Sequence, residues 1–103
     1  AAAKKAVEAA PEVVEVRVVL STAYSRAGLA EDALAHARAA VDLNPASTAA
    51  QTAMGTAYAR LGRLGEAEAA WQRAVEIDPQ NVEARENLEN LKAKRKPEGK
   101  SME

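Results

Sequence analysis

Side chains able to do chemistry are scarce in this chain of 103 residues. Its single histidine, His36, has one carboxylate at helical spacing, that of Asp32, and cysteine is absent. Because a protein zinc site uses three or four such ligands, we predict no metal site and expect His36 to be a surface side chain. A serine nucleophile needs a histidine base, and neither Ser21 nor Ser25 forms a known triad pattern with His36. We therefore predict a protein that is not an enzyme, with no catalytic residues and no cofactors.

The charge of the chain is nearly balanced, with 14 basic and 15 acidic residues. Residues 92–103 net +3 (five basic, two acidic), while residues 1–91 net −4 (nine basic, thirteen acidic). Because basic runs at a helix end are favoured by the helix dipole, we do not expect nucleic acid as a partner. No stretch approaches the ~18 consecutive apolar residues that a membrane-spanning helix needs, so we expect no such helix. The chain begins with AAAKK and not with Met, which indicates a processed chain or a piece of a longer protein.

Arg26 and Arg60 lie 34 residues apart and belong to a repeat. A shift of 34 positions aligns residues 14–45 with residues 48–79 without a gap and gives ten identical pairs. The pairs are Thr22/Thr56, Ala23/Ala57, Tyr24/Tyr58, Arg26/Arg60, Gly28/Gly62, Ala33/Ala67, Ala35/Ala69, Ala40/Ala74, Val41/Val75 and Pro45/Pro79. Alanine can match by chance in an alanine-rich chain, but Tyr, Arg, Gly and Pro do not readily share one register. The sequence therefore encodes two similar units.

The sequence of each unit predicts two antiparallel helices. Gly28 and Gly62 follow the first helix, where glycine accepts the positive φ of a helix C-terminus. Pro45 and Pro79 follow the second helix, because proline lacks the amide proton and disfavours helical geometry in the residue before it. Ser47 then stands where its hydroxyl can cap the next helix.

Partial units extend the repeat at both ends. Residues 4–11 align with residues 38–45, and residues 81–96 match a first helix. The valine-rich stretch 12–20 alternates like a β-strand, but the matching stretch 48–54 has no strand character, so we expect a helix. The predicted helices are 2–10, 12–27, 30–43, 47–61, 65–77 and 81–95, followed by a flexible tail at 97–103.

The repeat resembles the tetratricopeptide repeat, a unit of 34 residues with the pattern W-x2-L-G-x2-Y, then A-x3-F, then P. The first unit has at these positions Arg17, Leu20, Ser21, Tyr24, Ala33, Ala37 and Pro45. The second unit has Gln51, Met54, Gly55, Tyr58, Ala67, Trp71 and Pro79. Both units keep the Tyr, Ala and Pro positions.

This resemblance implies an all-α fold, a short right-handed α-solenoid of antiparallel helix pairs with about six helices. The aromatic rings of Tyr24, Tyr58 and Trp71 are then expected in the core and not as a stacking platform for bases. The predicted domain, similar to tetratricopeptide repeat domains, covers residues 1–96. It consists of a partial unit 1–11, full units 12–45 and 46–79, and a terminal helix 80–96.

Proteins of this family bind a peptide segment of a partner in a concave groove lined by the first helix of each unit. The resemblance therefore implies a protein–protein interaction module. The family's groove positions, carried over to this chain, give the expected partner-binding residues Glu15, Val18, Val19, Thr22, Arg26, Thr52, Ala53, Thr56, Arg60, Glu83 and Asn87. A wider groove set adds Ser25, Ala49, Ala59, Glu86 and Asn90.

We expect the groove to take an extended or helical segment with small apolar anchors. Val18 and Val19 would contact the anchors, and Arg26 and Arg60 would pair with an acidic group of the partner. The alternative is that the two valines only cover the end of a truncated unit, because exposed apolar side chains mark cut surfaces as well as interfaces.

Chaperone-binding members of the family hold a C-terminal carboxylate with a clamp of Lys, Asn and Arg side chains. The matching positions hold Val18, Thr22, Ala53, Glu83 and Asn87. The clamp is absent, and we predict no binding of a chaperone-type acidic C-terminal peptide.

Two other functions stay open at this point. The partial unit at the N-terminus could present an unfilled apolar surface to a second copy, which would make the chain a self-assembly module and a homo-oligomer. The chain could also be the recruiting portion of a larger enzyme, such as a glycosyltransferase.

Overall fold

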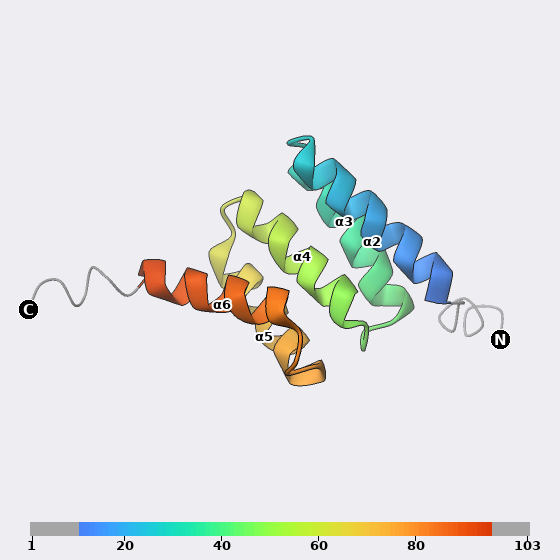
Figure 1. Ribbon diagram of the computed structural model, residues 1–103. Coiled ribbons are helices and arrows are strands. Elements are labelled where there is room, and N and C mark those ends of the chain that lie inside the picture. The colour runs from blue at the N-terminus through green and yellow to red at the C-terminus, as the bar shows by residue number, and fades with distance from the viewer. Residues whose placement is uncertain (1–10, 96–103) are drawn as a thin grey trace, which may run out of the picture.

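The computed structural model describes residues 11–95, which form five α-helices (Figure 1). α2 spans Pro11–Arg26, α3 spans Ala30–Leu43, α4 spans Thr48–Arg60, α5 spans Leu64–Ile77 and α6 spans Val82–Arg95. The predicted all-α fold is confirmed, and residues 11–95 contain no strand. The predicted helix at 2–10 and the predicted tail at 97–103 lie outside the described residues.

The turns inside the two helix pairs are closed by glycine. Gly28 has a φ of 84° and Gly62 a φ of 81°, the left-handed conformation that a side chain would oppose. The amide of Leu29 donates to the carbonyl of Tyr24 at 2.9 Å, and Arg63 donates in the same way to Tyr58 at 2.9 Å. These bonds satisfy carbonyls of the last helical turn in the Schellman manner.

The turns between units end in capping side chains. Ser47 Oγ accepts a hydrogen bond from the amide of Ala50 at 3.1 Å. One period later, Asn81 Oδ1 accepts from the amide of Ala84 at 2.8 Å. Each cap satisfies one of the amides that a helix start leaves without a partner, which fixes where α4 and α6 begin.

The valine-rich stretch is helical because it packs as a helix. Val14 is 6% exposed and forms a buried cluster with Ala40 and Ala50, against which Val18 also packs. The penalty of valine in a helix is a few tenths of a kcal/mol per residue. Burial of one side of α2 against α3 and α4 outweighs it, and the alternation seen in the sequence has no counterpart in the structure.

Alanine allows the helices to pack closely. Ala33, Ala40, Ala67 and Ala74 are all completely buried, at matching positions of α3 and α5. Side chains of this size bring helix axes to the short end of the usual ~8–10 Å range. The core is therefore distributed along the stack and consists of several small clusters.

The aromatic side chains differ in depth. Trp71 is 6% exposed and packs with Leu88 and Leu91 of α6, and its Nε1 donates to the carbonyl oxygen of Thr52 at 3.2 Å. Gly55 lies directly beneath the indole, because a Cβ at this position would be 2.5 Å from Trp71 Cδ1 and Nε1. This contact joins α4, α5 and α6. Tyr24 and Tyr58 are half-buried at the edge of the core formed by Ala33, Leu34 and Ala57.

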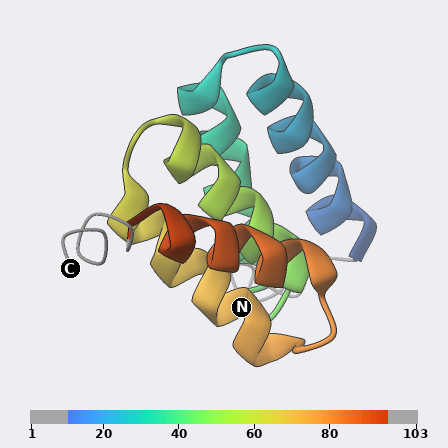
Figure 2. The same ribbon diagram turned by 60° about the vertical axis from the view of Figure 1, so that its left-hand side comes forward.

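The helix pairs stack in a row. α2 packs antiparallel to α3 and α4 packs antiparallel to α5, while α3 and α2 both contact α4 (Figures 1 and 2). α2 and α4 therefore run in the same direction, side by side. Matching residues of the two units face the same surface, at corresponding heights along the two helices. In the described part of the chain, no helix combines the length and apolarity that crossing a bilayer requires.

Candidate functional site

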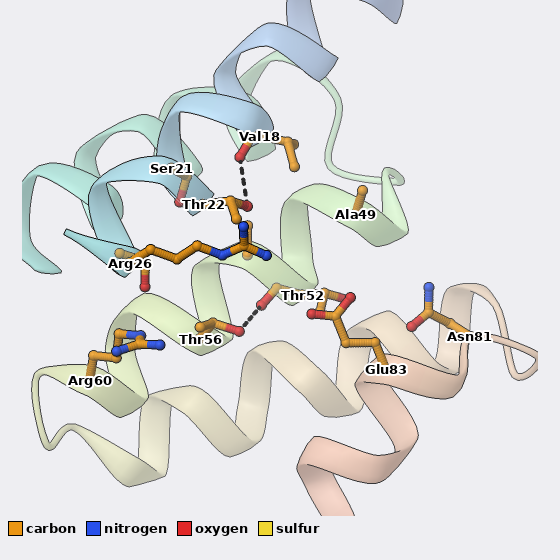
Figure 3. A pocket seen from close by; sticks show the side chains of 12 residues that line it. Val18, Ser21, Thr22, Arg26, Ala49, Thr52, Thr56, Arg60, Asn81 and Glu83 are labelled. Carbon is orange, nitrogen blue, oxygen red and sulfur yellow. Dashed lines mark hydrogen bonds between the residues drawn. The ribbon is translucent and has the colours of Figure 1, made fainter. Parts of the chain in front are cut away.

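A pocket of about 300 Å³ lies where α2, α4 and the start of α6 meet (Figure 3). We call it the α2–α4 groove. Its lining residues are Val18, Ser21, Thr22, Ser25, Arg26, Ala49, Thr52, Ala53, Thr56, Arg60, Asn81 and Glu83. Small side chains make most of this surface, and the charged ones are two arginines and one glutamate.

Helical spacing brings these residues together. Val18, Thr22 and Ser25 recur at intervals of four and three on α2, as do Ala49, Ala53 and Thr56 on α4. Residues three and four apart share one face of a helix. Because the two helices are parallel neighbours, both faces open into one groove.

Eight of the predicted partner-binding residues line the groove: Val18, Thr22, Arg26, Thr52, Ala53, Thr56, Arg60 and Glu83. Glu15, Val19 and Asn87 do not line it. Val19 is 59% exposed and lies about 100° around α2 from Val18, so it faces another direction. Glu15 is exposed nearer the start of α2, and Asn87 is half-buried one turn farther along α6.

Three threonine hydroxyls of the groove donate back into their own helices. Thr22 Oγ1 donates to the carbonyl of Val18 at 3.1 Å, and Thr56 Oγ1 donates to that of Thr52 at 3.1 Å. Thr52 Oγ1 donates to the carbonyl of Thr48 at 2.8 Å. With its proton committed, each hydroxyl oxygen keeps only acceptor capacity.

The two serines have different roles. Ser21 is 1% exposed, and its Oγ donates to the carbonyl of Ala33 at 2.8 Å, which joins α2 to α3. Ser25, one turn later, is 5% exposed, and its Oγ has no partner among the described residues. Neither serine is positioned by a histidine, since the ring of His36 is engaged elsewhere.

The arginines of the groove are exposed cations. Among residues 11–95, Arg26 and Arg60 have no ion pair and no side-chain hydrogen bond. Arg63 is different, because it forms an ion pair with Glu66 at 2.8 Å and lies over the ring of Tyr58. The hydrogen bond from Arg63 lowers the pKa of the Glu66 carboxyl below its ordinary value.

The sequence model of the tetratricopeptide repeat matches residues 18–82, more than half of the chain. The chain belongs to the tetratricopeptide repeat family. The match covers residues 18–45 of the first unit and all of the second, so α2 and α4, which form most of the groove, are the first helices of two tetratricopeptide repeats.

Two solved tetratricopeptide repeat domains are similar to the chain. The first domain of human RPAP3 is 30% identical, with a TM-score of 0.72, over 75% of this chain and 61% of that one. The first domain of Spaghetti (RPAP3), solved with the HSP90 peptide SRMEEVD, is 29% identical, with a TM-score of 0.73, over 78% and 64%. The chain thus spans less than two thirds of either. No curated protein sequence matches it significantly.

Two groove residues were missed by carrying family positions over. Ser21 occupies the glycine position of the tetratricopeptide repeat pattern, which was not among the positions carried over. Asn81 was expected only as a helix cap, and it also lines the groove. The signal for Ser21 was present, since it lies at helical spacing from Val18 and Ser25.

His36 is not the surface side chain that the sequence indicated. It is half-buried, its ring stacks on Tyr24 with centroids 5.2 Å apart, and its Nδ1 lies 3.0 Å from Arg17 NH1. Arg17 stands at the tryptophan position of the tetratricopeptide repeat pattern, and this contact with α3 uses its guanidinium. Within residues 11–95, no group of three His, Asp or Glu side chains could hold a metal ion.

Proposed function

We propose that this chain is a protein-interaction module that binds a segment of a partner protein in the α2–α4 groove. The observation that supports the proposal is the groove itself, which crosses two parallel helices at matching repeat positions in a tetratricopeptide repeat fold. The groove is concave, and six neutral polar and three charged side chains converge on it, which is how a ligand site fixes the orientation of what it binds.

The shape and chemistry of the groove define the segment. Ala49 and Ala53 leave room for a main chain to approach the helices, and Val18 adds an apolar side. The threonine oxygens can accept hydrogen bonds from amides of the partner. A segment with small apolar anchors fits this surface, in either an extended or a helical conformation.

The proposal is tested by selecting peptides from a random library on the immobilised chain and measuring their affinity by fluorescence anisotropy. Ala53→Arg, which places a long side chain in the groove, should abolish binding. Ala69→Arg, on an exposed position of α5 outside the groove, should leave it unchanged. Both variants must keep the helical circular dichroism spectrum. Selected peptides that bind equally well to Ala53→Arg would refute the groove as the site.

The HSP90 peptide SRMEEVD should not bind in the mode of chaperone-binding relatives. The clamp positions Val18, Thr22, Ala53, Glu83 and Asn87 hold no cation, and the carboxylate of Glu83 would repel a C-terminal carboxylate. The measurement is an anisotropy titration of SRMEEVD and of its C-terminal amide. Tight binding that the amide loses would contradict this prediction.

A second candidate function, self-association, is favoured by one observation. Val13, Val16 and Leu20 are 43%, 57% and 36% exposed, and they form a stripe along α2 outside the groove. Three exposed apolar side chains at helical spacing can pack against a second copy. Sedimentation at several concentrations, with Val16→Glu as the comparison, separates this function from segment binding.

A further inference from the structure

We propose that the α2–α4 groove is positively charged at one end and negatively charged at the other, and that its partner segment carries an acidic side chain at one end and a basic side chain at the other. Arg26 and Arg60 would hold the acidic group, and Glu83 would hold the basic one. This inference rests on the proposed function and adds to it the chemistry and the direction of the partner segment.

The arginine end follows from the repeat. Arg26 is the last residue of α2 and Arg60 is the last residue of α4, and the two helices are parallel. Both side chains therefore start from the same end of the groove, and Figure 3 shows that of Arg26 extending from there along the groove. They are exposed and unpaired within residues 11–95, so an anionic group of the partner can approach either of them. Guanidinium groups bind carboxylates with paired hydrogen bonds, which suits Asp or Glu of a partner.

The opposite end has the opposite charge. Glu83 lies in the first turn of α6, and in Figure 3 its carboxylate is across the groove from Arg60. Asn81 beside it uses its Oδ1 to cap α6, so Glu83 is the charged group of this end. Among the described residues Glu83 has no ion pair. A Lys or Arg side chain of the partner would form an ion pair with Glu83.

The surface between the two ends is neutral. Thr22, Thr52 and Thr56 have their hydroxyl protons committed to carbonyls, and Ala53 is apolar. A segment inserted with reversed polarity would set like charges against each other at both ends. Electrostatic complementarity of this kind selects orientation and partner more than it adds affinity. The groove would therefore bind such a segment in one direction.

The test compares peptides selected from one random library on three forms of the chain. The unchanged chain should enrich peptides with an acidic residue toward one end and a basic residue toward the other. Arg26→Glu with Arg60→Glu should replace only the acidic preference with a basic one, and Glu83→Lys should replace only the basic preference with an acidic one. Binding of the original peptides to the double variant should weaken about tenfold, with a smaller loss at high salt.

Variants with neutral side chains show whether a loss of binding comes from the removed charge or from misfolding. Arg26→Gln with Arg60→Gln, and Glu83→Gln, should each lose one charge preference without acquiring the opposite one. Selected peptides with no charge preference, or with preferences unchanged by the reversals, would overturn the inference. If Ala53→Arg still abolishes their binding, the proposed function survives that result. If Ala53→Arg leaves binding intact, the proposed function fails instead.

Discussion

Gly55→Ala should destabilise the protein, although alanine is the better helix residue. The exchange of glycine for alanine inside a helix ordinarily gains about 0.5–1 kcal/mol. At this position the new Cβ would be 2.5 Å from Cδ1 and Nε1 of Trp71, which forces the buried indole to move. Overpacking of this kind costs about 1–3 kcal/mol, so we expect a net loss of about 1–2 kcal/mol. Urea unfolding followed by circular dichroism measures it.

Gly65→Ala is the matched control. Gly65 is also helical, in the first turn of α5, and a Cβ there has no atom within 4 Å. This variant should be neutral or gain up to about 1 kcal/mol, because only the intrinsic preference of the helix changes. A stabilising Gly55→Ala would show that the indole has room that the structure does not give it.

Trp71→Ala should have the largest effect on the free energy of unfolding. Trp71 fills the space between Gly55 of α4 and the pair Leu88 and Leu91 of α6, and it is 6% exposed. Deletion of a buried tryptophan side chain costs about 3–5 kcal/mol, a large share of the ~5–15 kcal/mol of a typical domain. We expect partial unfolding at room temperature and early loss of α6. Circular dichroism is the measurement, since the variant has no tryptophan fluorescence.

Two companion variants identify the cause of that loss. Trp71→Phe keeps a ring but removes the hydrogen bond to the carbonyl of Thr52, and it should be clearly milder than Trp71→Ala. In the Trp71→Ala background, Gly55→Ala should no longer be destabilising, because its clash partner is gone. Additive effects of the two changes would contradict the contact as described.

The helix boundaries could be predicted because local residues determine them. Gly28 and Gly62 end their helical turns through their own positive φ, and Ser47 caps α4 by accepting a hydrogen bond from the amide three residues later. Repetition then fixed the stacking, since a period of 34 residues with one motif leaves little freedom in the arrangement of the pairs. At the valine-rich start of α2 the local preference opposed the helix, and the packing of α2 against its neighbours outweighed that preference.

The details of the groove depend on contacts that the sequence does not reveal. Position in the repeat placed Val18 and Arg26 in the groove, but it also suggested Val19, which a turn of about 100° directs elsewhere. The environment of His36 depends on Arg17 and Tyr24 of another helix, neither of which is near it in sequence. Side-chain partners of this kind are set by the stacking of helices and not by the pattern of one segment.

The fit of Trp71 onto Gly55 limits how the two units can be recombined. In the first unit the same two positions hold Ala37 and Ser21, so the indole-on-glycine contact of the second unit has no equivalent there. A hybrid hairpin that takes its first helix from one unit and its second from the other would either crowd the indole or leave a void. Longer arrays engineered from this chain should therefore be joined at Pro45, where whole hairpins are exchanged, and not at Gly28 or Gly62.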